Sequence, residues 1–140
     1  MRHLKRGVKL GREREARRAL LLHLASALIL HEKIKTTEKK AKALIPQVEE
    51  LVNLAKQNQK RKLLQKGLRK NVFLKLTEEI GKWYPGRKSG YLKVVPLYYR
   101  KGDDTKVFQV SFSTHEDVEI KKEGKVTQNA EDKSSAKKKK

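Results

Sequence analysis

The chain has 140 residues and a formal net charge of +20, from 36 Lys and Arg against 16 Asp and Glu. This length suits one compact domain with tails, and 36% hydrophobic against 37% charged residues is a low apolar content for a free-standing globule. The absence of cysteine excludes disulfides, thiolate catalysis and cysteine-ligated zinc. Because so much positive charge opposes compaction, we expect a small basic protein that completes its stability on nucleic acid.

The charge is distributed along the whole chain. Residues 1–18 carry a net +6 and residues 116–140, which end in four lysines, carry +2, so +12 remains on residues 19–115. We predict three parts: a basic RNA-binding arm that leads into the first helix (1–18), an α+β body (19–115) and a disordered, polar and charged tail (116–140).

The first predicted helix begins within residues 11–15 and ends near His31. Its most apolar stretch, residues 19–30 (ALLLHLASALIL), is shorter than the roughly 20 residues that cross a membrane. It also lacks the layout of a signal peptide. Apolar residues cover a broad side of this helix, which predicts that it is packed on more than one side as the central helix of the core.

A short strand over residues 33–37 and an amphipathic helix over residues 41–55 follow. Thr36 or Thr37 is suited to cap that helix, and Pro46 is expected to kink it or to delay its start. Residues 60–83 form a third helical region, which Gly67 and Asn71 divide into two helices.

The final segment predicts a β-hairpin. Residues 84–90 (YPGRKSG) are typical of a loop, and strands over residues 91–99 and 106–113 are joined by the turn RKGDDT. Phe108, Val110 and Phe112 alternate with polar residues, so one face is buried, and Pro96 belongs at an edge or bulge. The predicted fold is a single two-layer α+β domain, of order α-β-α-α(-α)-β-β, with the helices on a small mixed sheet.

No residue pattern indicates catalysis. Glu78 and Glu79 are adjacent and point about 100° apart on a helix, and Asp103 and Asp104 suit a turn. The four histidines lack metal-ligand spacing, and there is no nucleophile elbow or phosphate-binding loop. We therefore predict no enzyme activity, no cofactor, no metal, no membrane partner and no small-molecule substrate.

The basic N-terminal segment is the strongest functional signal, because its cations recur every three or four residues and continue into the core helix. Arginine forks match phosphate oxygens, and glycines let the backbone approach a nucleic acid closely. The candidate contacts from this pattern are Arg2, Lys5, Arg6, Lys9, Arg12, Arg14, Arg17 and Arg18, with Gly7 and Gly11 between them.

The loop before the hairpin is a second candidate contact. Arg87, Lys88, Ser89 and Gly90 precede Tyr91, a combination that suits a clamp on an RNA backbone. In an equally weighted alternative, Tyr91 only packs on the sheet. The spread of charge, together with the lack of a helix-turn-helix or an RNA-recognition-motif pattern, favours structured RNA over duplex DNA.

Four segments of the chain resemble bacterial large-subunit ribosomal protein seventeen. They are MRHLKRGVKLGR at the start, HEKIKTTEKKAKAL at residues 31–44, EEIGKWYPGRKSGYLKV at residues 78–94 and RKGDD at residues 100–104. The resemblance implies an α+β structural component bound to large-subunit ribosomal RNA and neighbouring ribosomal proteins, near the nascent-chain exit. It also implies a location in a ribosome of the bacterial cytoplasm or of an organelle.

The resemblance also implies RNA contacts at the matching positions. These are Arg2, His3, Lys5, Gly7, Lys9, Gly11, Arg12, Arg17, Lys35, Thr36, Thr37, Lys40, Lys42, Arg87, Ser89, Gly90 and Tyr91. The expected function is RNA binding that supports assembly of the large subunit. A nucleoid-type DNA-binding protein is the alternative, and a small RNA-processing enzyme is a third hypothesis.

Overall fold

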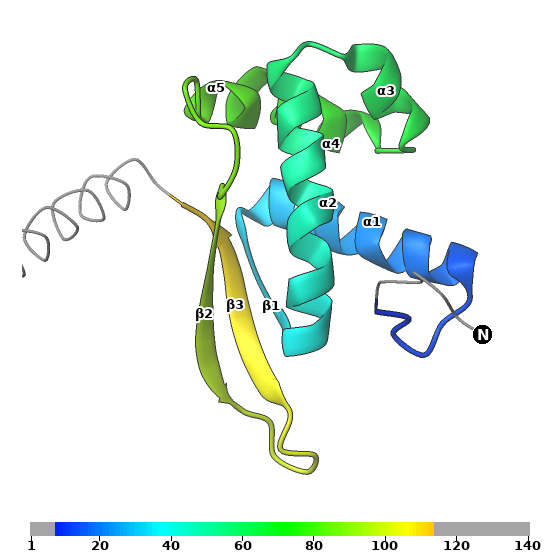
Figure 1. Cartoon of the computed structure of the whole chain (residues 1–140), viewed down its shortest axis with the longest axis vertical. Helices are drawn as coiled ribbons and strands as arrows, with labels where there is room; N and C mark the ends of the chain where they lie inside the picture. The colour runs from blue at the N-terminus through cyan, green and yellow to red at the C-terminus, as the bar shows by residue number, and fades with distance from the viewer. Residues whose placement is uncertain (1–7, 114–140) are drawn as a thin grey trace, which may run out of the picture.

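The structure, a computed structural model, describes residues 8–113 and confirms the α+β class (Figure 1). The elements follow in the predicted order, with residue bounds α1 Arg14–His31, β1 Lys33–Thr37, α2 Glu38–Lys56, α3 Lys60–Gln65, α4 Lys70–Lys75, the π-helical turn η1 Leu76–Ile80, α5 Gly81–Trp83, β2 Leu92–Tyr99 and β3 Lys106–Phe112. Within this part of the chain, none of the helices combines the length and apolar character that a membrane crossing requires.

The three strands form an antiparallel sheet of order β1-β3-β2. The expectation of a mixed sheet is wrong in this respect, because β3 lies between the other two strands and runs opposite to both. Ile34 of β1 and Val94 of β2 both pair with Val110, so these side chains share the core face. The prediction for Pro96 is confirmed: β2 is an edge strand, and its register shifts between Pro96 and Tyr98.

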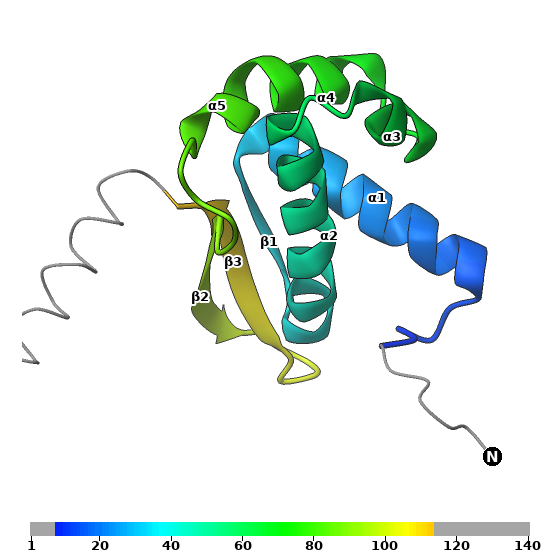
Figure 2. The ribbon, with the colours of Figure 1, turned by 45° about the horizontal axis from the view of Figure 1, so that its top comes forward.

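Helix α2 is the central helix of the core, which corrects the expectation that α1 has this role. Figure 2 shows α2 lying along the sheet, with α4 and α5 across its C-terminal end. Six α2 residues are buried, whereas α1 buries three, all in its C-terminal half. The apolar periodicity of α1 is real, but its N-terminal half extends beyond the elements that could cover it (Figure 1).

Two local expectations about α2 are also changed. The helix begins at Glu38 and continues through Pro46, which is exposed. Thr37 occupies the N-cap position, yet its side chain makes no capping hydrogen bond. The division of the third helical region is confirmed at Gly67, because α3 ends before this residue and its φ of +78° favours glycine. The expectation for Asn71 is wrong, since this residue lies within α4.

Candidate nucleic-acid interface

The described part of the N-terminal arm forms a turn that leads into α1. The Arg12 backbone N–H donates to the Lys9 carbonyl at 3.2 Å, and Gly11 adopts a φ of +62° with open space around its Cα. Lys9, Gly11 and Arg12 are exposed. The predicted contacts Arg2, His3, Lys5, Arg6 and Gly7, and the predicted tail, lie outside the described residues.

The first turns of α1 bring the next three predicted arginines together. Arg17 and Arg18 follow Arg14 by three and four residues, so each lies next to Arg14 on the helix surface. The Arg17 Nη1 donates to the Arg12 carbonyl at 3.3 Å. Among the described residues, Arg14 and Arg18 have no hydrogen-bond or ion-pair partner, so their guanidinium groups are available to an external anion.

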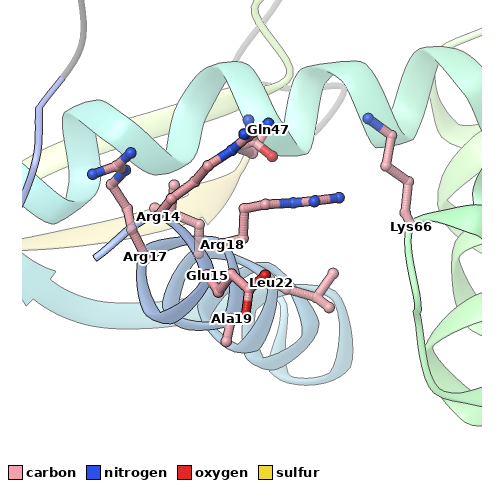
Figure 3. Close-up of a pocket in the computed structure, with 9 residues that line it drawn as sticks. Arg14, Glu15, Arg17, Arg18, Ala19, Leu22, Gln47 and Lys66 are labelled. Atoms are coloured by element: carbon pink, nitrogen blue, oxygen red, sulfur yellow. The ribbon is translucent and has the colours of Figure 1, made fainter. Parts of the chain in front are cut away.

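These arginines line a cleft of about 580 Å³, here called the α1 cleft (Figure 3). Its cationic side chains are Arg14, Arg17, Arg18 and Lys66. Ala19, Leu21 and Leu22 form its apolar part, and Glu15 and Gln47 complete the lining. The cleft lies between α1, α2 and the segment that joins α3 to α4, three regions that are distant in the sequence.

A second group of cations lies on the sheet face that α2 does not cover. Lys33 and Lys93 both pair with Ser111, and Lys35 pairs with Gln109, so the three lysines share one face. All three are exposed. Sequence reasoning selected Lys35 but missed Lys33 and Lys93, although the alternation of β1 already directed its lysines outward.

The other predicted residues near β1 are less accessible. Thr36 is on the core face and is 9% exposed, and Thr37 and Lys40 are half-buried. Lys42 donates to Glu38 at 2.5 Å, and this contact lowers the pKa of the Glu38 carboxyl. Exposed pairs of this kind contribute little to stability, so Lys42 can exchange Glu38 for a phosphate at little cost.

Hydrogen bonds hold the loop before β2 against the body. The Arg87 Nη1 donates to Ser113 Oγ at 3.0 Å, and its guanidinium lies 5.9 Å from the centre of the Tyr84 ring. The Gly90 N–H donates to Glu49 at 2.8 Å. Lys88 and Ser89 remain exposed, and Arg87 and Lys88 border a hollow of about 430 Å³.

Tyr91 is fully buried, which favours the alternative in which it packs inside the protein. Its ring lies 5.0 Å from that of Tyr84. Its hydroxyl is 2.5 Å from Asn53 Oδ1 and 2.8 Å from the Arg87 carbonyl, which also accepts a hydrogen bond from Lys56. Tyr91 therefore positions the loop rather than offering a surface for a base. Burial also raises the pKa of the Tyr84 hydroxyl, which donates to Ser113.

The acidic residues and histidines considered above can also be located in the structure. Within residues 8–113, no group of three or more His, Asp or Glu is arranged to hold a metal ion. Glu78 and Glu79 are exposed. The described residues therefore form a small basic α+β protein whose cations lie on open surfaces at separate parts of the body.

Sequence comparison identifies the family. The profile described as ribosomal protein L17 matches residues 20–113. Proteins named "Large ribosomal subunit protein bL17" are similar: that of Persephonella marina is 43% identical over 85% of this chain and 100% of its own length. The corresponding proteins of Azorhizobium caulinodans and Rickettsia bellii are 40% and 37% identical, over 86% and 91% of this chain and 88% and 90% of their own lengths. The chain belongs to the ribosomal protein L17 family.

Proposed function

We propose that this chain is a structural constituent of the large ribosomal subunit and that it binds ribosomal RNA and neighbouring ribosomal proteins. Its membership in the ribosomal protein L17 family carries this proposal, because relatives named as large-subunit proteins align over most of both chains. The same membership favours a structural role over an enzymatic one. We further propose that the protein lies in a ribosome of the bacterial type, in the cytoplasm or in an organelle, near the nascent-chain exit.

The proposed mechanism is neutralisation of phosphate charge together with a fit to RNA shape. Residues 1–18 act as the RNA-binding arm, residues 19–115 as the body and residues 116–140 as a charged tail. Support comes from the exposed Lys9 and Arg12, from Arg14 and Arg18, and from the lysines on the open sheet face. Cations on several surfaces suit docking between RNA helices. We propose that this docking supports assembly of the large subunit.

Sedimentation of a native cell extract tests the proposal directly. Stoichiometric co-migration with large subunits at moderate and high salt is the expected result. Migration as free protein, or with the chromosome, would reject the ribosomal role and favour the nucleoid-type alternative, which the family membership does not favour. Turnover of an RNA substrate by the purified protein would instead indicate an enzyme.

The salt dependence of binding tests the contribution of the arm. Log K falls linearly with log salt, with a slope proportional to the number of neutralised phosphates. Replacing Arg2, Lys5 and Arg6 together by glutamine should reduce that slope for large-subunit ribosomal RNA. An unchanged slope would exclude these three residues as phosphate contacts.

A further inference from the structure

The α1 cleft combines two features, and a phosphate site needs only the first of them. Three arginines and a lysine surround it, and Leu21 and Leu22 form an apolar surface within it. A groove that only followed an RNA backbone would require the cations. The leucines need a separate explanation.

The apolar surface of the cleft continues the core stripe of α1. Leu21, Ala25 and Leu28 are four and three residues apart and lie on one side of the helix. The body buries Ala25 and Leu28, whereas Leu21 and Leu22 are half-buried and face the cleft. Covering them would remove further apolar surface from water, which stabilises a complex.

The polar groups favour a nucleotide as the occupant. In Figure 3, Arg14, Arg17 and Gln47 lie toward one end of the cleft, Lys66 lies at the other end, and Arg18 extends between them. Guanidinium groups bind phosphate through paired hydrogen bonds and stack on planar rings. Gln47 can both donate to and accept from a base edge. The volume of about 580 Å³ falls within the roughly 300–1,000 Å³ of small-molecule sites.

We infer that the α1 cleft receives one unstacked nucleotide of the bound RNA. The base lies on Leu21 and Leu22, Gln47 and Glu15 face its edge, and Arg14, Arg17 and Arg18 hold the adjoining phosphates. Lys66 pairs with Glu50 at 2.6 Å, with both side chains partly exposed, and can exchange this partner for a phosphate. This inference rests on the proposed RNA binding and adds the kind of RNA feature that is recognised, since unstacked bases occur in bulges and loops.

The test compares two RNA hairpins that differ only by one bulged nucleotide, using the full-length protein. The bulged hairpin should bind more tightly than the fully paired one. Leu21→Ala should weaken binding of the bulged hairpin roughly tenfold, because it removes apolar contact with the base, and should leave the paired hairpin unchanged. Leu22 is less suitable, since its side chain also lies beside Gly67.

Leu64→Ala is the matched control, because Leu64 is 61% exposed on α3 and does not line the cleft. It should change neither affinity. Arg18→Gln should weaken both hairpins, since it removes a phosphate contact. As an independent readout, the Leu21 methyl resonances in NMR spectra should shift with the bulged hairpin and not with the paired one.

Three results would overturn the inference: equal affinity for the two hairpins, an equal effect of Leu21→Ala on both, or Leu21 methyl resonances that shift when residues 1–7 are removed in the absence of RNA. The last result would mean that the cleft holds the chain's own arm. If large-subunit ribosomal RNA also fails to bind, the proposed function itself is rejected. If that RNA binds without discrimination of the bulge, only the present inference fails.

Discussion

The first turns of α1 and the loop before β2 are both rich in cations, yet their cations have different surroundings. Arg14 and Arg18 have no partner among the described residues and border an open cleft. In the loop, Arg87 instead donates to Ser113, and Lys56 at the end of α2 donates to Tyr91 and to the loop backbone. A positive charge that already has internal partners stabilises the fold, whereas one without partners is free to bind an external anion. The positive charge that the sequence contains and the positive charge that is available for binding are therefore different quantities in this protein.

The largest expected effect is loss of stability at the loop. Tyr91→Ala removes a fully buried ring together with the hydroxyl that meets Asn53 and the Arg87 carbonyl. Truncation of a buried aromatic residue costs about 3–5 kcal/mol of unfolding free energy, which urea denaturation would measure. Tyr98→Ala is the control, because Tyr98 is 55% exposed, and should change stability by about 0.5 kcal/mol or less. Similar losses in the two variants would remove the structural role assigned to Tyr91.

For α1 we expect little change in stability and a large loss of RNA affinity. Replacing Arg14, Arg17 and Arg18 together by glutamine should leave the urea midpoint nearly unchanged, and should weaken binding to large-subunit ribosomal RNA roughly a hundredfold at about 0.15 M salt. This estimate follows from about three lost phosphate contacts. The salt slope should fall by roughly two to three.

The control for that triple variant removes the same charge elsewhere. Lys60, Arg61 and Lys62 are exposed at the start of α3, and their replacement by glutamine should have a smaller effect on the slope. If the two triple variants lose equal affinity, RNA binding depends on the total charge. The lack of internal partners at Arg14 and Arg18 would then not determine RNA affinity.

A smaller effect is expected at Ser113, which joins the end of β3 to the loop. Its hydroxyl donates to the Tyr91 carbonyl at 3.0 Å and accepts from Arg87. Ser113→Ala should cost about 1–2 kcal/mol, since a buried hydrogen bond is lost, and should leave RNA affinity unchanged. A marked loss of affinity without loss of stability would mean that the Arg87 orientation matters for RNA and not for the fold.

The smallest effect is expected at the hairpin turn, where Arg100 donates to both carboxylate oxygens of Asp103, at 3.0 and 2.5 Å. Hydrogen bonds from Arg100 and then from Thr105 hold the pKa of Asp103 well below its usual range. Because the folded-state pKa is lowered, the stabilising contribution is present above the unfolded pKa and is lost as the pH falls below about 4. The group is fully exposed, so the change should be slight.

An NMR titration of the Asp103 carboxyl group should therefore show ionisation that persists at acidic pH. Asp103→Asn should make the urea midpoint less sensitive to pH in this range, and Asp104→Asn controls for the loss of one negative charge. A normal titration of Asp103 would mean that Arg100 is free and belongs with the available cations.

Several features could be predicted from the sequence because they depend on local periodicity. The α1 and α2 stripes, the break at Gly67 and the hairpin follow from the spacing of apolar residues and from glycine and proline. The buried face of β3 and the irregularity at Pro96 follow from strand alternation. The family was also recognisable from short motifs, and the matched profile confirms it.

The accessibility of the candidate residues could not be predicted in the same way. The sequence places Tyr91 beside cations, but its burial depends on Tyr84 and Asn53. Likewise, the sequence shows that Lys33 and Lys35 alternate with Ile34, but their grouping with Lys93 depends on the position of β3 between two strands.

Composition, local periodicity and motifs were enough to predict the basic character, the α+β class, the order of elements and the family. The folded chain was needed to show which helix is central, which cations have internal partners and where the α1 cleft lies. Those properties depend on how elements far apart in the chain pack together, which brings Arg18, Gln47 and Lys66 around one cleft. Their physical cause is packing, which decides which apolar stripe is covered and which charges remain in water.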